Sequence, residues 1–245
     1  MIRTAYFIAR RLREPARSGK FDIDRQSVRC YSEGVPTRLP IAAVLALALC
    51  CAPVTASAQA DRRDQAQRLA DEALAMGKKA DKLETGWQAA YDSGIALAEQ
   101  AIAADPAVAD AHYALFVTLG RKAERTGISA QAMQISKLKG LLDKTLVLDP
   151  GHAHAWEAKG EMLMRLPRLF GGSESDGESA LRHSADLDPK WAKPPLRLAE
   201  FDWKNGRGNQ ARAEAERARD LARAAGDTDF VAEAEALLKR MSESS

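Results

Sequence analysis

Apolar side chains recur every three or four residues along most of the chain after residue 60, with Arg, Lys, Asp and Glu between them. This spacing puts the apolar residues on one side of a helix, whereas a half-buried strand would show strict alternation, which no segment sustains. The expected helices cover residues 61–80, 87–104, 109–122, 130–147, 153–166, 190–204 and 209–225, with one more that Ser175 or Asp176 caps and Asp186 ends, and a last one after a capping segment at 227–229. The sequence therefore predicts an all-α fold.

Three Asp-Pro pairs divide the helices into groups. Asp105-Pro106, Asp149-Pro150 and Asp188-Pro189 each follow one helical segment and precede another, with the prolines 44 and 39 residues apart. A period of this length is typical of stacked helix pairs. We therefore expect an α-solenoid of antiparallel pairs, with a first pair at 61–107, three repeats at 108–225, and a capping helix and tail at 226–245.

The first 60 residues have the features of an export signal. Arg38 precedes an apolar run at 41–52, which is too short to span a bilayer and which Pro53 is expected to end. Small residues then favour cleavage after Ala60, or after Ala58 as a second choice. A lipid anchor on Cys50 or Cys51 is the alternative, and the true start of translation is either Met1 or about Val35. We expect an exported, periplasmic protein.

Charge and cysteine content argue against nucleic-acid binding and against cysteine chemistry in the exported chain. Of 36 basic and 34 acidic residues, nine and four precede residue 61, which leaves 27 and 30 and a net charge of −3. A chain with that balance has no bulk attraction for nucleic acid. All three cysteines also precede residue 60, so the exported chain would have no disulfide, thiolate nucleophile or cysteine metal site.

The repeats resemble tetratricopeptide repeats. Trp156, Gly160 and Leu163 have the spacing of the first helix of such a repeat, although Lys159 replaces the usual Leu. The last repeat matches through Leu198-Ala199, Gly206, Ala211 and Ala218. The extra length of the other repeats, relative to the usual 34 residues, falls at 121–132 and 167–173. The resemblance covers roughly residues 62–225 and implies protein binding on a concave face lined by the first helix of each pair.

A second resemblance, to the T-components of TRAP transporters, rests on Leu166-Pro167 and Gly171-Gly172 and on the extra residues between helices. It implies an auxiliary subunit of a solute-uptake system, in contact with a binding protein or holding an apolar ligand.

The tetratricopeptide alignment implies a set of side chains on the concave face. They are Asp110, Tyr113, Val117, Arg121, His154, Glu157, Glu161, Arg165, Lys193, Leu196, Glu200, Trp203 and Lys204. A mixture of aromatics and both charges suits a peptide or a helix, and the alternative is a solvated helix face with i,i+4 ion pairs. The clamp that some repeats use for a terminal carboxylate is not expected, because Tyr113, Glu157 and Leu196 replace its basic and amide groups.

One group of residues raises the alternative of a metal-dependent enzyme. His152 and His154 stand two residues apart beside Glu157, but on a helix they would point about 200° apart, and we expect surface histidines instead. Gly171-Gly172-Ser173 lacks the residues of a phosphate loop and is expected to let Leu169 and Phe170 pack under the helices.

The favoured hypothesis is thus a non-enzymatic scaffold without cofactor or metal, which binds another protein or peptide and has no membrane span after cleavage; an oligomer is compatible with it.

Overall fold

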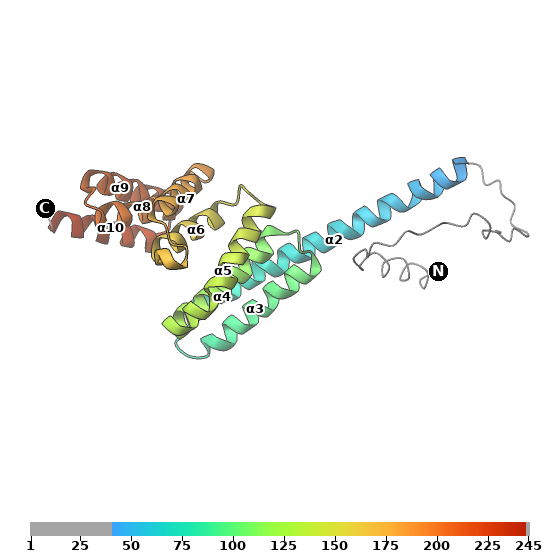
Figure 1. Ribbon diagram of the computed structural model, residues 1–245, viewed down its shortest axis with the longest axis horizontal. Helices are drawn as coiled ribbons and strands as arrows, with labels where there is room; N and C mark the ends of the chain where they lie inside the picture. Colours follow the sequence, from blue (N-terminus) through green and yellow to red (C-terminus); the bar gives the residue numbers. More distant parts are fainter. Residues whose placement is uncertain (1–40, 244–245) are drawn as a thin grey trace, which may run out of the picture. The chain divides into compact units, whose positions relative to one another are not determined.

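The computed structural model describes residues 41–243, with side chains from residue 57 onward, and it divides into units Met1–Cys50 and Cys51–Ser245. The helices are α2 (Ile41–Asp81), α3 (Trp87–Ala104), α4 (Ala109–Thr126), α5 (Ile128–Leu148), α6 (Ala153–Arg165), the 3-10 turn η1 (Arg168–Phe170), α7 (Glu174–Leu187), α8 (Lys193–Lys204), α9 (Gly208–Ala225) and α10 (Thr228–Glu243) (Figure 1). No strand occurs within residues 41–243, so the all-α prediction is confirmed. The choice of start codon and the lipid-anchor alternative fall outside the residues whose side chains are described.

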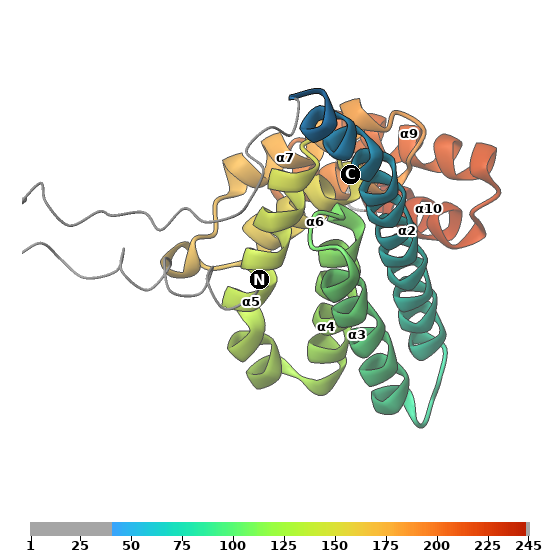
Figure 2. The same ribbon diagram turned by 90° about the vertical axis from the view of Figure 1, so that its right-hand side faces the viewer.

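Small residues bring the first three helices together. Ala66, Ala70 and Ala73 of α2 are fully buried against Ala98 and Ala101 of α3 and against the start of α4. A Cβ added at Gly94 of α3 would lie 3.2 Å from the carbonyl oxygen of Ala73, so a larger residue there would push the two helices slightly apart. Figure 2 shows α2 to α5 side by side. Alanine side chains are small enough to allow the helices to pack this closely.

The pair α6–α7 is packed even more tightly. A Cβ at Gly160 would lie 2.7 Å from Leu181 Cγ and 3.0 Å from the carbonyl oxygen of Gly177. A Cβ at Gly177 would lie 3.0 Å from the carbonyl oxygen of Gly160. Two glycines that face one another therefore set the distance between these helices.

The last three helices share a separate core. It consists of Leu196, Ala199, Ala211, Ala215, Ala218, Ala234, Leu237 and Met241. The helix α10 begins where Asp227 Oδ1 accepts a hydrogen bond from the Phe230 backbone N–H at 3.2 Å, as expected for the capping segment. The stacked antiparallel pairs and the additional α10 confirm the predicted tetratricopeptide-like architecture.

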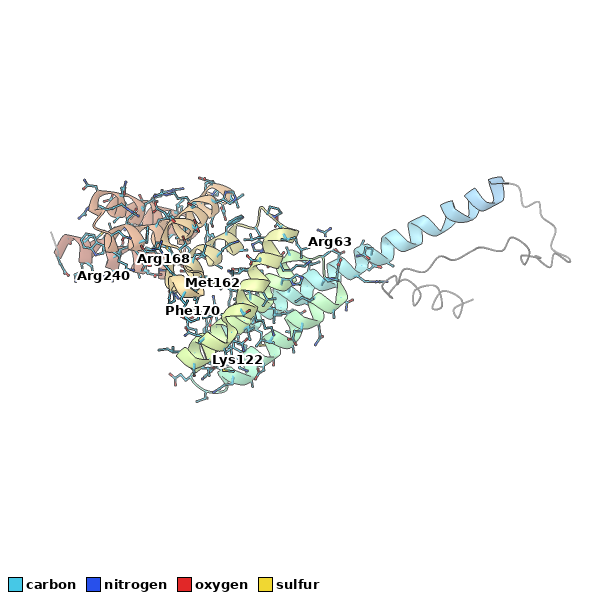
Figure 3. All side chains as sticks on the ribbon, in the orientation of Figure 1. Arg63, Lys122, Met162, Arg168, Phe170 and Arg240 are labelled. Atoms are coloured by element: carbon cyan, nitrogen blue, oxygen red, sulfur yellow. The ribbon has the colours of Figure 1, made fainter. Side chains whose placement is uncertain are left out.

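Two expectations about connections were wrong. The extra residues at 121–132 form no loop: they lengthen α4 and α5, which Gly127 alone connects at a φ of 126°. Leu169 and Phe170 do not pack under the helices either, since they are 89% and 57% exposed (Figure 3). The Gly172 and Phe170 N–H groups both donate to the Pro167 carbonyl, so the loop closes on itself and its side chains point outward.

The start of α7 also differs from the prediction. Ser173 is its N-cap and accepts a hydrogen bond from the Asp176 backbone N–H at 3.3 Å, whereas Ser175 and Asp176 lie inside the first turn. The helix begins earlier because the preceding loop ends with the Ser173 N–H bonded to the Leu163 carbonyl.

The helix α2 runs through Pro53, which was expected to end it; the fixed φ of a proline is compatible with a helix, at the cost of one backbone hydrogen bond and of crowding against the carbonyl four residues earlier. Residues 57–65 are exposed, and Ala66 is the first buried residue of the helix. Among the described residues, no helix is both long enough and apolar enough to cross a bilayer.

Candidate functional site: a groove between the first helices

A groove of about 900 Å³ follows the first helices of the repeats. The helices α4, α6 and α8 line it, α5 closes one side, and α10 closes the far end. The lining includes Tyr113, Phe116, Val117, Arg121, Glu124, Arg125, Ile135, Leu138, Glu157, Glu161, Met162, Arg165, Lys193, Arg197, Asp227, Asp229, Phe230 and Glu233. The curvature of stacked helix pairs produces such a concave surface.

The side of the groove formed by α4 and α5 is apolar. Tyr113 and Phe116 stack at 6.1 Å between ring centroids, and Ile135, Leu138 and Met162 surround them. Burial raises the pKa of the Tyr113 hydroxyl, and the nearby carboxylate of Glu157 raises it further. Tyr113 thus remains a neutral aromatic surface at physiological pH.

The side formed by α6, α8 and α10 is an ion-pair network. Lys193 Nζ lies 2.7 Å from Glu157 Oε1 and 3.6 Å from Glu161 Oε2. Arg197 Nε lies 2.7 Å from Glu161 Oε1, and Arg197 Nη1 lies 3.0 Å from Glu200 Oε2 and 2.6 Å from Glu233 Oε1. Two cations therefore hold four carboxylates from three helices.

The carboxyl groups of this network respond to their surroundings in opposite directions. Burial raises the pKa of Glu157 to about 7, against the effect of Lys193 and with a further rise from Glu161. Burial would also raise the pKa of Glu161, but Lys193 and Arg197 together hold it below its ordinary value. The side chain of Glu157 is only 2% exposed, so it is a buried acid at the edge of the groove.

Arginines mark the other end of the groove. Arg121 pairs with Asp81, which also accepts a hydrogen bond from the Tyr91 hydroxyl. Arg125 donates to the carbonyl of Ala80 at 2.9 Å and lies over the Trp87 ring at 4.7 Å. These contacts attach the end of α4 to α2 and α3.

The structure brings together part of the predicted set and separates the rest. Of the candidates, it places Tyr113, Val117, Arg121, Glu157, Glu161, Arg165 and Lys193 in the groove lining. His154, Glu200, Trp203 and Lys204 lie outside that lining.

The contacts of the displaced candidates explain their positions. His154 packs on Trp191 at 4.0 Å between ring centroids, and Trp203 packs on the core of α8–α10. Glu200 pairs with Arg197, and Lys204 lies 3.6 Å from Glu174 on another side. Asp110 bonds to Gln67 and His152, and Leu196 is fully buried.

Two groups of lining residues were missed by the sequence analysis. Arg197 occupies the position that the alignment gave to Leu196, because α8 begins at Lys193 with Pro194 and Pro195 in its first turn and not at residue 190. Asp229, Phe230 and Glu233 come from α10, which was assigned only a capping role, and Asp227 comes from the turn just before it. The place of α10 as the next first helix in the stack was the signal available in the sequence.

The histidine pair has a structural role. His152 is buried, not on the surface as expected, and its Nδ1 accepts a hydrogen bond from the Ala155 backbone N–H at 3.0 Å as the N-cap of α6. Its Nε2 then carries the proton and lies 3.0 Å from Asp110 Oδ1. Both ring nitrogens are in use, and no group of three potential metal ligands occurs among the described residues. His152 therefore joins α6 to α4.

Comparison with known proteins identifies the family. Residues 43–165 match the model of the family described as regulator of microtubule dynamics protein 1-3. The chain belongs to this family. In this member of the regulator of microtubule dynamics family, the matched residues run from α2 to the end of α6. They include the apolar side of the groove, whereas Lys193, Arg197 and Glu233 lie beyond the match.

Several solved structures are similar to this family member. The thermophilic TPR protein TTC0263 of Thermus thermophilus has 16% identity and a TM-score of 0.45, over 69% of this chain and 98% of that chain. MamA has 18% identity and a TM-score of 0.41, over 72% and 88%. PilF of Pseudomonas aeruginosa has 16% identity and a TM-score of 0.34, over 74% and 95%. No curated protein matches the chain.

Proposed function

We propose that this protein is an exported, non-enzymatic scaffold that holds a segment of another protein in the groove. The groove itself carries the proposal: the first helices of the repeats line it, and its α4–α5 side offers an apolar surface with two stacked aromatic rings. Apolar and aromatic anchors in a preformed groove are the features that bind amphipathic segments.

The composition of the lining supports binding rather than catalysis. The residues that line the groove include no Ser, Thr, Cys or His, so the lining holds no Ser–His or Cys–His pair. On the α6–α10 side, Glu157, Glu161 and Glu233 form ion pairs with Lys193 or Arg197. The family is also described by a regulatory role, not by a reaction.

The position of the first buried residue supports export. Cleavage after Ala60 would leave Ala66 and every later core position in place, because residues 57–65 contribute no buried side chain. Sequencing the N-terminus of the protein purified from its native host should give Asp61. A purified chain that begins at Met1 would contradict the proposal that the protein is exported.

Site-specific crosslinking tests the groove. A photoreactive amino acid at Val117, in the lining, should give a discrete adduct in cells, whereas the same group at Gln210, exposed on α9, should not. Ile135→Asp places a charge in the apolar floor and should abolish the Val117 adduct. Val147→Asp is the matched control, because Val147 is 75% exposed on the same helix and lies outside the lining. Equal adducts at both positions, or equal loss with both variants, would contradict the proposal.

A further inference from the structure

The two ends of the groove differ in charge. On the α6–α10 side, the lining contains five carboxyl groups, from Glu157, Glu161, Asp227, Asp229 and Glu233, against Lys193 and Arg197; the net charge is −3 when all are ionised and −2 when Glu157 is protonated. On the α2–α5 side, with Arg165, it contains three arginines against Asp81 and Glu124, a net of +1. Because the two ends carry net charges of opposite sign, the groove favours a bound segment whose own charges are distributed in the complementary way.

The cations on the acidic side are already engaged. Lys193 is shared by Glu157 and Glu161, and Arg197 by Glu161, Glu200 and Glu233. An incoming carboxylate would have to displace one of these partners and would leave a buried acid such as Glu157 without its cation, which is costly. An acidic segment is therefore disfavoured at this end.

The carboxylates include one that is available. Asp229 is exposed at the first turn of α10, lines the groove, and forms no ion pair with any described residue. Asp227 uses one oxygen to cap the same helix, and the side chain of Glu233 remains 40% exposed beside Arg197. Negative charge thus faces the groove next to the apolar ring of Phe230.

From these observations, which rest on the proposed function, we infer that the groove takes a basic amphipathic segment of another protein. Its apolar side chains lie over Phe116, Ile135 and Met162, and its Lys or Arg residues lie beside Asp229 and Glu233. The apolar contact supplies area, and the acidic end selects the charge and fixes which end of the segment meets α10.

A displayed library of random peptides, selected on the purified protein, is the probe. Selection proceeds with counter-selection on Ile135→Asp, which removes peptides that bind outside the groove; thermal unfolding confirms that this variant is folded. The enriched peptides should contain Lys or Arg next to an apolar cluster more often than the input library. Enrichment of Asp or Glu, or no charge bias, would overturn the inference and leave groove binding intact. Absence of any enriched peptide would overturn the proposed function as well.

Charge reversal then locates the acidic contact. Asp229→Lys should weaken binding of an enriched basic peptide by about fivefold, in line with an exposed ion pair that becomes a repulsion. The same change at Glu216, exposed on α9 and outside the lining, should leave binding unchanged. Replacing the peptide's basic residues with Glu should restore binding to Asp229→Lys. Equal loss with both variants would show a bulk charge effect and would overturn the assignment.

Discussion

The two sides of the groove are held together by different interactions. Helices α2 to α4 meet through buried alanines and Gly94, and the floor that α4 and α5 present is apolar. Helices α6, α8 and α10 meet at the groove through buried and half-buried ion pairs, with the Gly160–Gly177 contact behind them. Apolar contact gives area with little selectivity, whereas a fixed set of charges discriminates between partners. In the proposed complex, the first side supplies affinity and the second supplies specificity.

The largest expected effect comes from the glycine contact behind the charged side. Gly160→Val would place side-chain atoms where even a Cβ lies 2.7 Å from Leu181 Cγ, so we expect a loss of about 3 kcal/mol or more in the free energy of unfolding. Gly140→Ala is the control: its Cβ meets nothing within 4 Å on α5, and it should stabilise the protein by about 0.5–1 kcal/mol.

Amide hydrogen exchange of Gly160→Val tests whether the two sides are separate. We expect α6 and α7 to lose protection while α2 to α4 retain it, because the alanine core of the first three helices does not include α6. Equal loss of protection over the whole chain would show that the two sides unfold as one unit. Their different contacts would then have no counterpart in separate local stabilities.

Periodicity and turn residues predicted much of this fold, and the limits of that prediction have physical causes. The bounds of α3 agreed residue for residue, because Gly86 and Asp105 mark its ends. On α8, Lys193 was placed correctly in the groove, but Leu196 was assigned to it in place of Arg197, because Pro194 and Pro195 set the start of the helix and the alignment did not account for them. The outward position of Phe170 depends on backbone hydrogen bonds within 167–173, which residue types alone do not specify. The pairing of Arg197 with Glu233, 36 residues away, is a tertiary contact that no local pattern encodes.

His152 tests the junction between the two sides. It caps α6 and bonds to Asp110 of α4, which in turn accepts a hydrogen bond from Gln67 of α2 at 2.8 Å. His152→Ala should therefore lower the unfolding free energy by about 2 kcal/mol, roughly half from the cap and half from the bond to Asp110. His183→Ala is the control, since His183 is exposed and contacts the Trp156 ring at 4.8 Å between centroids.

The His152→Ala variant should also change an NMR titration. The hydrogen bond from His152 is the main cause that lowers the pKa of Asp110, with a smaller contribution from Gln67. NMR titration should show a higher Asp110 pKa in His152→Ala than in the wild type. An unchanged pKa would mean that the histidine acts on α6 alone and does not join the two sides.

Glu157 gives the charged side a pH dependence near neutrality. Its folded pKa of about 7 lies above the ordinary 4.5, so its contribution to stability is fully present below 4.5 and is lost as pH rises through 7. Glu157→Gln should remove this dependence, with a gain relative to the wild type of about 1 kcal/mol at the alkaline end of the range. Urea unfolding midpoints on either side of neutrality measure the difference.

Glu161→Gln is the matched control for that titration. The pKa of Glu161 is lowered, so its contribution is present above the ordinary value and is lost only as the pH falls below it. Its removal should alter the acidic part of the stability profile and leave the slope near neutrality unchanged. Equal slopes near neutrality in Glu157→Gln and the wild type would mean that Glu157 does not titrate there.

The smallest expected effect concerns the helix caps. On the α2–α5 side, none of α3, α4 and α5 has a side-chain cap, whereas His152 and Ser173 cap α6 and α7. Ser173→Ala should cost about 0.5 kcal/mol, because its hydrogen bond from the Asp176 N–H is long. Ser175→Ala, at one of the two cap positions that the sequence predicted, should change the unfolding free energy by less than that. A larger loss at Ser175 in chemical denaturation would mean that α7 begins later than in this structure. The Ser173 cap would then not be the interaction that orders the first turn of α7, which holds Gly177 against Gly160.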